Sequence, residues 1–196
     1  KRAKNWQFYI DAIFENPLSA PAALKNTEAL KKRYKEAYNS EELRAAILHV
    51  SPHTIIEMDS PTRKERSIAI RSMPEIVTTL PSPTQNELRQ AIMLNPRLIT
   101  HYKDNQELVR LALSEDGMVI DRIDNPTEDQ IRNAILQNPK AILKLKSATK
   151  AQRKLALTRN GLLIHDLPNP TPKERLVAIN SRPHVVKDLP NLTDEE

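Results

Sequence analysis

Residues 84–96 read TQNELRQAIMLNP and residues 127–139 read TEDQIRNAILQNP, and this pattern recurs along the chain roughly every 22 residues. Each copy carries an Ala followed by Ile or Leu, on which the copies align. The units run 5–26, 39–61, 62–83, 84–104, 105–126, 127–148, 149–170 and 171–192. A repeat of this length cannot bury its own apolar face, so the pattern predicts units that stack on their neighbours.

The first residue of each unit is typical of a helix N-cap, whose side-chain oxygen accepts a hydrogen bond from a backbone N–H of the first turn. These residues are Asn5, Asn39, Thr62, Thr84, Asn105, Thr127, Thr149 and Thr171. Glu or Gln follows three residues later in most units, which predicts capping boxes. The box residues are Glu42, Glu65, Glu87, Gln130, Gln152 and Glu174.

A small residue and a helix breaker follow at fixed places. The small residue is Ala12, Ala46, Ala69, Ala91, Ala112, Ala134, Ala156 or Ala178. It lets neighbouring backbones approach closely, while the Ile or Leu beside it fills the core. The breaker is Pro17, Pro52, Pro74, Pro96, Pro139, Pro183, Gly117 or Gly161. Proline removes a helical donor, and we expect the glycines to supply a left-handed turn.

A second apolar pair, three residues apart, follows the breaker and fits one face of a short α or 3₁₀ helix. The pairs are Ile55 and Met58, Val77 and Leu80, Ile99 and Tyr102, Ile120 and Ile123, Ile142 and Leu145, Ile164 and Leu167, and Val186 and Leu189. No segment alternates apolar and polar residues as a strand would. The sequence therefore predicts an all-α fold, an α-solenoid of about eight two-helix repeats.

The pattern Thr-x-x-Glu-x-Arg-x-x-Ala-Ile-x-x-x-Pro, with two short helices in each unit, resembles the leucine-rich repeat variant proteins. The resemblance covers nearly the whole chain from residue 5 onward. It implies a right-handed superhelix of alternating α and 3₁₀ helices that serves as a binding scaffold, since the family shares no active site. The units here are shorter, and the cysteines that accompany an iron–sulfur centre in one family member are absent.

The N-terminal region departs from the period, whereas the C-terminal end begins a further copy of it. Residues 1–38 form an aromatic-rich N-terminal region that contains the first repeat at 5–26 and an inserted helix at 27–38. Its rings, among them Trp6, Phe8, Tyr34 and Tyr38, suit either an end cap or a partner-binding patch. Seven repeats fill residues 39–192, and residues 193–196 match the start of a further one. We therefore expect the chain to be a segment of a longer polypeptide.

Seven arginines recur two or three residues before the repeated Ala and form a candidate partner-binding ladder. They are Arg44, Arg66, Arg89, Arg110, Arg132, Arg153 and Arg175. Three interpretations remain open: a structural ladder, in which same-helix carboxylates pair with the arginines and their stems cover the seam between units; a surface facing an acidic protein; or a row that tracks nucleic-acid phosphates.

Composition adds little chemistry. The formal charge is +5, cysteine is absent and the only two glycines cannot form a phosphate loop. We find no catalytic constellation, and we expect no cofactor, metal, small-molecule ligand or membrane span, with an intracellular location favoured. The sequence predicts a non-enzymatic protein-interaction or structural scaffold, with a nucleic-acid-binding solenoid as the alternative. A viral origin is compatible with this hypothesis.

Overall fold

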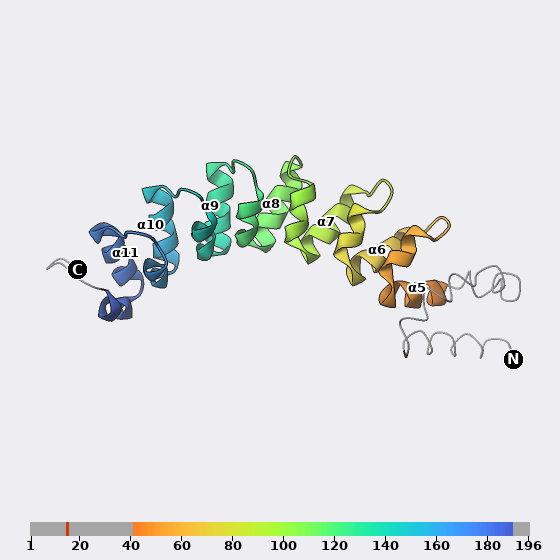
Figure 1. Cartoon of the computed structure of the whole chain (residues 1–196), viewed down its shortest axis with the longest axis horizontal. Helices are drawn as coiled ribbons and strands as arrows, with labels where there is room; N and C mark the ends of the chain where they lie inside the picture. Colours follow the sequence, from red (N-terminus) through yellow and green to blue (C-terminus); the bar gives the residue numbers. More distant parts are fainter. Residues whose placement is uncertain (1–14, 16–40, 190–196) are drawn as a thin grey trace, which may run out of the picture. The chain divides into compact units, whose positions relative to one another are not determined.

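The computed structural model describes residue 15 and residues 41–189 of the chain. The chain divides into two compact units, residues 1–95 and residues 96–196. Every element within 41–189 is helical, and an α-helix alternates with a 3₁₀ helix throughout this range (Figure 1). This alternation is the arrangement that the repeat predicts.

Each α-helix in residues 41–189 has ten residues, and each 3₁₀ helix has five or six. The α-helices are α5 Glu41–Val50, α6 Arg63–Ser72, α7 Gln85–Leu94, α8 Gln106–Glu115, α9 Glu128–Gln137, α10 Lys150–Arg159 and α11 Pro172–Ser181. The 3₁₀ helices are η1 Pro52–Ile56, η2 Pro74–Thr78, η3 Pro96–His101, η4 Gly117–Arg122, η5 Pro139–Lys144, η6 Gly161–His165 and η7 Pro183–Asp188.

Helices pack in chain order inside each compact unit. In the first, α5 contacts α6 and α6 contacts α7, while η1 lies against α6 and η2 against α7. In the second, α8 through α11 pack in sequence, with η4, η5 and η6 each against the α-helix of the next repeat. Each repeat thus buries its apolar residues against its neighbours, and the fold is an α-solenoid.

The predicted caps precede six of the α-helices of this range, α6 to α11. Complete capping boxes form at five of them, with the cap side chain accepting from the third backbone N–H and the box side chain accepting from the cap N–H. These boxes are Thr62 with Glu65, Thr84 with Glu87, Thr127 with Gln130, Thr149 with Gln152 and Thr171 with Glu174. Asn105 caps α8 without a box. Asn5 and Asn39 lie outside the described residues.

The breakers act as expected at proline but not at glycine. Met73, before Pro74, is extended at φ −151° and ψ 94°, because proline disfavours the helical region in the residue that precedes it. Asp116, before Gly117, has nearly the same conformation. No glycine in the described residues has a positive φ, so the predicted left-handed turn is wrong.

The glycines are explained by close approach. A Cβ built on Gly117 would lie 2.3 Å from the carbonyl oxygen of Ala134 in the next α-helix, and one on Gly161 would lie 2.5 Å from that of Ala178. At these two places the neighbouring backbone occupies the space of a side chain. Left-handed backbone occurs instead at the turns between repeats, at Ser60, Ser82, Asn125 and Asn169.

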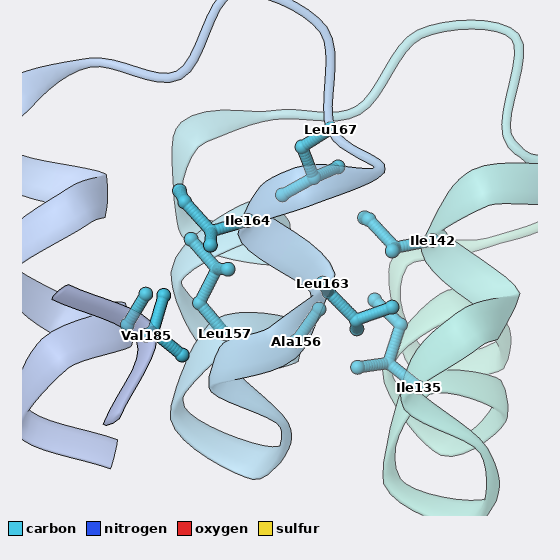
Figure 2. Packing of buried hydrophobic residues seen from close by; sticks show 9 residues of the cluster. Ile135, Ile142, Ala156, Leu157, Leu163, Ile164, Leu167 and Val185 are labelled. Carbon is cyan, nitrogen blue, oxygen red and sulfur yellow. The ribbon is translucent and has the colours of Figure 1, made fainter. Parts of the chain in front are cut away.

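The core follows the predicted apolar positions and adds one more. All seven repeated alanines from Ala46 to Ala178 are buried. In the second compact unit, Ile135, Ala156, Leu157, Leu163 and Ile164 belong to one cluster (Figure 2). Each 3₁₀ helix of the second to seventh described repeats also buries the residue before the first member of the predicted pair. These residues are Ile76, Leu98, Val119, Ala141, Leu163 and Val185.

Several predictions fall elsewhere in the chain. The first repeat at 5–26, apart from residue 15, the inserted helix at 27–38 and the start of a further repeat at 193–196 lie outside the described residues. So do the candidate aromatic residues Trp6, Phe8, Tyr34 and Tyr38.

Candidate binding surface

The seven candidate arginines occupy two different helical positions. Counted from the first residue of each α-helix, Arg44, Arg66, Arg153 and Arg175 are the fourth residue, whereas Arg89, Arg110 and Arg132 are the fifth. One step along an α-helix rotates a side chain by about 100°, because a turn has 3.6 residues. The arginines therefore do not form a single row.

Three of the arginines are half-buried and bind the box carboxylate of the following repeat, 21 residues on. Arg66 donates to Glu87 from Nε at 2.6 Å and from Nη2 at 3.0 Å. Arg153 makes the same two bonds to Glu174, at 2.6 and 3.2 Å. Arg44 binds Glu65 through the same two nitrogens. We call these contacts the inter-repeat ion pairs.

Each inter-repeat ion pair also involves the turn or the cap that lies between the two repeats. Nη2 of Arg66 donates to the carbonyl oxygen of Pro81 at 3.2 Å, and Glu87 accepts from the backbone N–H of Thr84 at 2.8 Å. The same guanidinium thus contacts the end of its own repeat and the first turn of the next α-helix. These arginines hold consecutive repeats together.

Glu87 is acidified by this environment. The hydrogen bond from Arg66 lowers its pKa, burial opposes this, and the hydrogen bonds from Thr84 lower it further, to about 2. Burial raises the pKa values of Glu65 and Glu174, but the bonds from Arg44 and Arg153 and from the cap residues outweigh it, and both pKa values fall below the usual range. The three box carboxylates are therefore held ionised.

Where the box residue is an amide, the arginine is replaced. Val109 and Ile131 occupy the positions that correspond to Arg66, and the box residues of the repeats after them are Gln130 and Gln152. Gln130 donates from Nε2 to Oε1 of Gln106 at 3.1 Å, and Gln152 donates to both carboxylate oxygens of Glu128. A neutral box residue thus needs no cation from the preceding repeat, whereas a buried carboxylate does.

A different set of cations faces solvent. Arg110, Arg132 and Lys154 stand two residues before the repeated Ala in α8, α9 and α10, and all three are exposed. We call them the exposed row. Arg89 holds the same position in the first compact unit and is exposed, whereas Arg175 is half-buried. Sequence analysis missed Lys154 because its neighbour Arg153 matched the arginine spacing.

Charge is unevenly distributed along the chain. Residues 139–189 hold eleven lysines and arginines against three carboxylates, a formal charge of +8. Residues 96–138 hold five against eight, a formal charge of −3. We call residues 139–189 the basic segment. The formal charge of the whole chain is only +5, so the basic segment carries more positive charge than the protein does as a whole.

Two other kinds of site are absent from the described residues. Among residues 15 and 41–189, no three His, Asp or Glu side chains come together as a metal site would require. No helix within those residues combines the length and the apolar character that a membrane span needs.

Comparison with known proteins yields no relative. No protein-family model, curated protein or solved structure matches this chain.

Proposed function

We propose that this chain is a non-enzymatic scaffold that binds a protein partner through the exposed cations of its second compact unit. The carrying observation is the charge of the basic segment, +8 over 51 residues. Of its arginines, Arg153 is engaged by Glu174, whereas Arg159 and Arg182 are exposed. Excess charge of one sign favours association with a surface of the opposite sign and speeds the encounter.

The repeated positions fall into two groups, those with contacts inside the array and those exposed to solvent, and this difference supports the proposal. Caps, box residues, alanines and breakers have contacts within the array that account for them. The exposed positions two residues before the Ala vary in type, from Arg132 to Lys154 to Leu176. Positions that vary on a regular frame are free to match a partner, as in other repeat proteins.

We infer further that the repeats are of the leucine-rich repeat variant kind. The alternation of ten-residue α-helices with five- or six-residue 3₁₀ helices supports this assignment. So does the shared Thr-x-x-Glu-x-Arg-x-x-Ala-Ile pattern. Such a frame supplies a binding surface without a shared active site.

The exposed row favours a second candidate, a nucleic-acid-binding solenoid. Arg110, Arg132 and Lys154 recur at consecutive α-helices, and neighbouring helix axes are typically ~8–10 Å apart. Such a row could contact successive phosphates. Two observations favour protein instead: carboxylates such as Glu128 and Asp129 share α9 with Arg132, and the basic segment contains no Phe, Trp or Tyr on which bases could stack.

The test uses the full chain as bait in a nuclease-treated extract of its source cells. Three forms are compared by quantitative mass spectrometry: the unchanged protein, Arg132→Glu with Lys154→Glu, and a control with Arg63→Glu and Arg71→Glu. The control changes the charge equally at two exposed residues of α6. We expect one protein to be retained by the unchanged form and the control and lost from the exposed-row variant.

Salt-dependent binding of defined oligonucleotides supplies the second arm. One combined result would favour nucleic-acid binding over protein binding. The chain would retain no protein, and it would bind oligonucleotides with an affinity that falls steeply with salt and is lost in the exposed-row variant. Equal retention of all proteins by the three forms would exclude the exposed row as the binding surface.

A further inference from the structure

A groove opens at the C-terminal ends of α9, α10 and α11, within the second compact unit. Its volume is about 450 Å³, and its lining includes Leu136, Arg159, Gly161, Leu162, Ser181 and Arg182. No carboxylate from residues 41–189 lines it.

The floor of the groove is fixed by backbone contacts. Asn160 is extended at φ −150°, and its side chain accepts from the N–H of Leu162 at 3.2 Å. Gly161 lets α11 approach, since an added Cβ would lie 2.5 Å from the Ala178 oxygen and 3.2 Å from Cβ of Arg182. In the core of these repeats, Ile135, Leu157 and Leu163 are buried (Figure 2). A close-packed base gives the groove a defined shape.

The walls offer two kinds of contact. Leu136 and Leu162 are exposed, at 38% and 43%. Arg159 and Arg182 are exposed, and neither makes an ion pair with any residue in the described range 41–189. This sets them apart from Arg153, whose guanidinium is held by Glu174. The groove is therefore mainly polar, with a small apolar part from its leucines and guanidinium groups that have donors to offer.

We infer that this groove binds an extended acidic segment of the partner protein. Carboxylates of the segment bind Arg159 and Arg182, and an aliphatic side chain packs against Leu136 and Leu162. Arginine pairs with carboxylates through two parallel hydrogen bonds, and arginine is enriched among the few residues that dominate the binding energy of protein interfaces. The inference rests on the proposed function, because it names where and how the partner is recognised.

Charge and apolar contact together select the occupant. Most of the residues that line the groove belong to the basic segment, whose formal charge of +8 favours an acidic ligand over a basic or neutral one. The two leucines add apolar area, for which the phosphate backbone of a nucleic acid has no counterpart. A peptide with carboxylates beside a Leu, Ile or Val satisfies both walls.

Selection from a displayed random peptide library tests the inference. The full chain is the bait, and each enriched peptide is synthesised and titrated against four forms of the protein. These are the unchanged chain, Arg159→Glu with Arg182→Glu, Leu162→Ser, and the charge-matched control Arg63→Glu with Arg71→Glu. If circular dichroism shows that the charge-reversal variant is unfolded, Arg159→Gln with Arg182→Gln replaces it.

The expected peptides carry at least two carboxylates and a neighbouring aliphatic residue. They bind the arginine variant about tenfold or more weakly, because the charge-assisted hydrogen bonds of both guanidinium groups are lost and the reversed charges repel the peptide. They bind Leu162→Ser several-fold more weakly and the control with unchanged affinity.

Three results would overturn the inference: enriched peptides without acidic character, acidic peptides that bind the arginine variant as well as the unchanged chain, or a library with no enrichment. A change of oligomeric state in the arginine variant would do so too, since it would make the groove a contact between copies. If the extract experiment still returned a specific partner, the scaffold function would survive the loss of the groove.

Discussion

Arg66 and Glu87 lie 21 residues apart in the sequence and are joined by two hydrogen bonds, of 2.6 and 3.0 Å, between the α-helices of successive repeats. Their side chains are 13% and 8% exposed. The carboxylate also closes the capping box of Thr84. One residue thus serves both the start of its own helix and the contact with the repeat before it.

Removing one partner of this pair should cost more than replacing both. Arg66→Ala leaves the Glu87 carboxylate buried without its cation, and we expect a loss of roughly 1–3 kcal/mol in the free energy of unfolding. The double change Arg66→Val with Glu87→Gln reproduces the Val109 and Gln130 combination of a later repeat and should recover most of that loss. Denaturant unfolding by circular dichroism measures both. A double variant no more stable than Arg66→Ala would contradict this account.

Acid should weaken the array through the same carboxylates. The pKa of Glu87 is about 2 in the fold, against 4.5 for the unperturbed group. Because the folded pKa is the lower one, the stabilisation is complete above about pH 4.5 and declines as the pH falls toward 2. Glu65 and Glu174 shift in the same direction. The midpoint of thermal unfolding, followed against pH, should fall less steeply in this window for Arg66→Val with Glu87→Gln; identical slopes would exclude Glu87 as a contributor.

The sequence predicts contacts between residues that are close along the chain better than contacts between residues of different repeats. Caps, capping boxes and helix ends depend on residues within a few positions of one another. The capping box of Thr84 and Glu87 can therefore be predicted from the pattern alone. The pairing of Arg66 with Glu87 is not, because it requires the stacking of one repeat on the next. Spacing alone also placed Arg153 with Arg132, although one residue of offset turns their side chains to different faces.

The role of the glycines illustrates the same limit. Gly117 ends a helix in the sequence pattern, and a left-handed turn was the natural expectation. Its actual requirement comes from the Ala134 carbonyl, 17 residues later, which no local pattern reveals. The groove was likewise unpredictable, because Leu136, Leu162 and Arg182 belong to three different repeats.

Gly117→Ala should destabilise the second compact unit. The new Cβ would lie 2.3 Å from a backbone oxygen, so the two repeats must separate, at a cost of roughly 1–3 kcal/mol. Hydrogen exchange should show faster opening of α8 and α9. The control is Pro139→Ala, which alters the equivalent position where a side chain is already present. Equal effects of the two changes would show that close approach is not the reason for glycine.

The turn between repeats gives a prediction about backbone conformation. Asn125 has φ 50° in the left-handed region, just before Pro126. Asn125→Ala should cost about 1 kcal/mol, because an alanine Cβ is disfavoured there, whereas Asn125→Gly should cost little. Chemical denaturation of both variants measures the difference. Equal midpoints for the alanine and glycine variants would argue against strain at this position.

The central claim is that repeated arginine positions hold the array together while the adjacent exposed cations do not. Arg153 and Lys154 are neighbours on α10, and only Arg153 pairs with Glu174. The most direct test is the free energy of unfolding of Arg153→Gln and Lys154→Gln, which remove the same charge. We expect a loss of roughly 1–3 kcal/mol for Arg153→Gln and a change within about 0.5 kcal/mol for Lys154→Gln. Equal losses, or a larger loss for Lys154→Gln, would contradict the account.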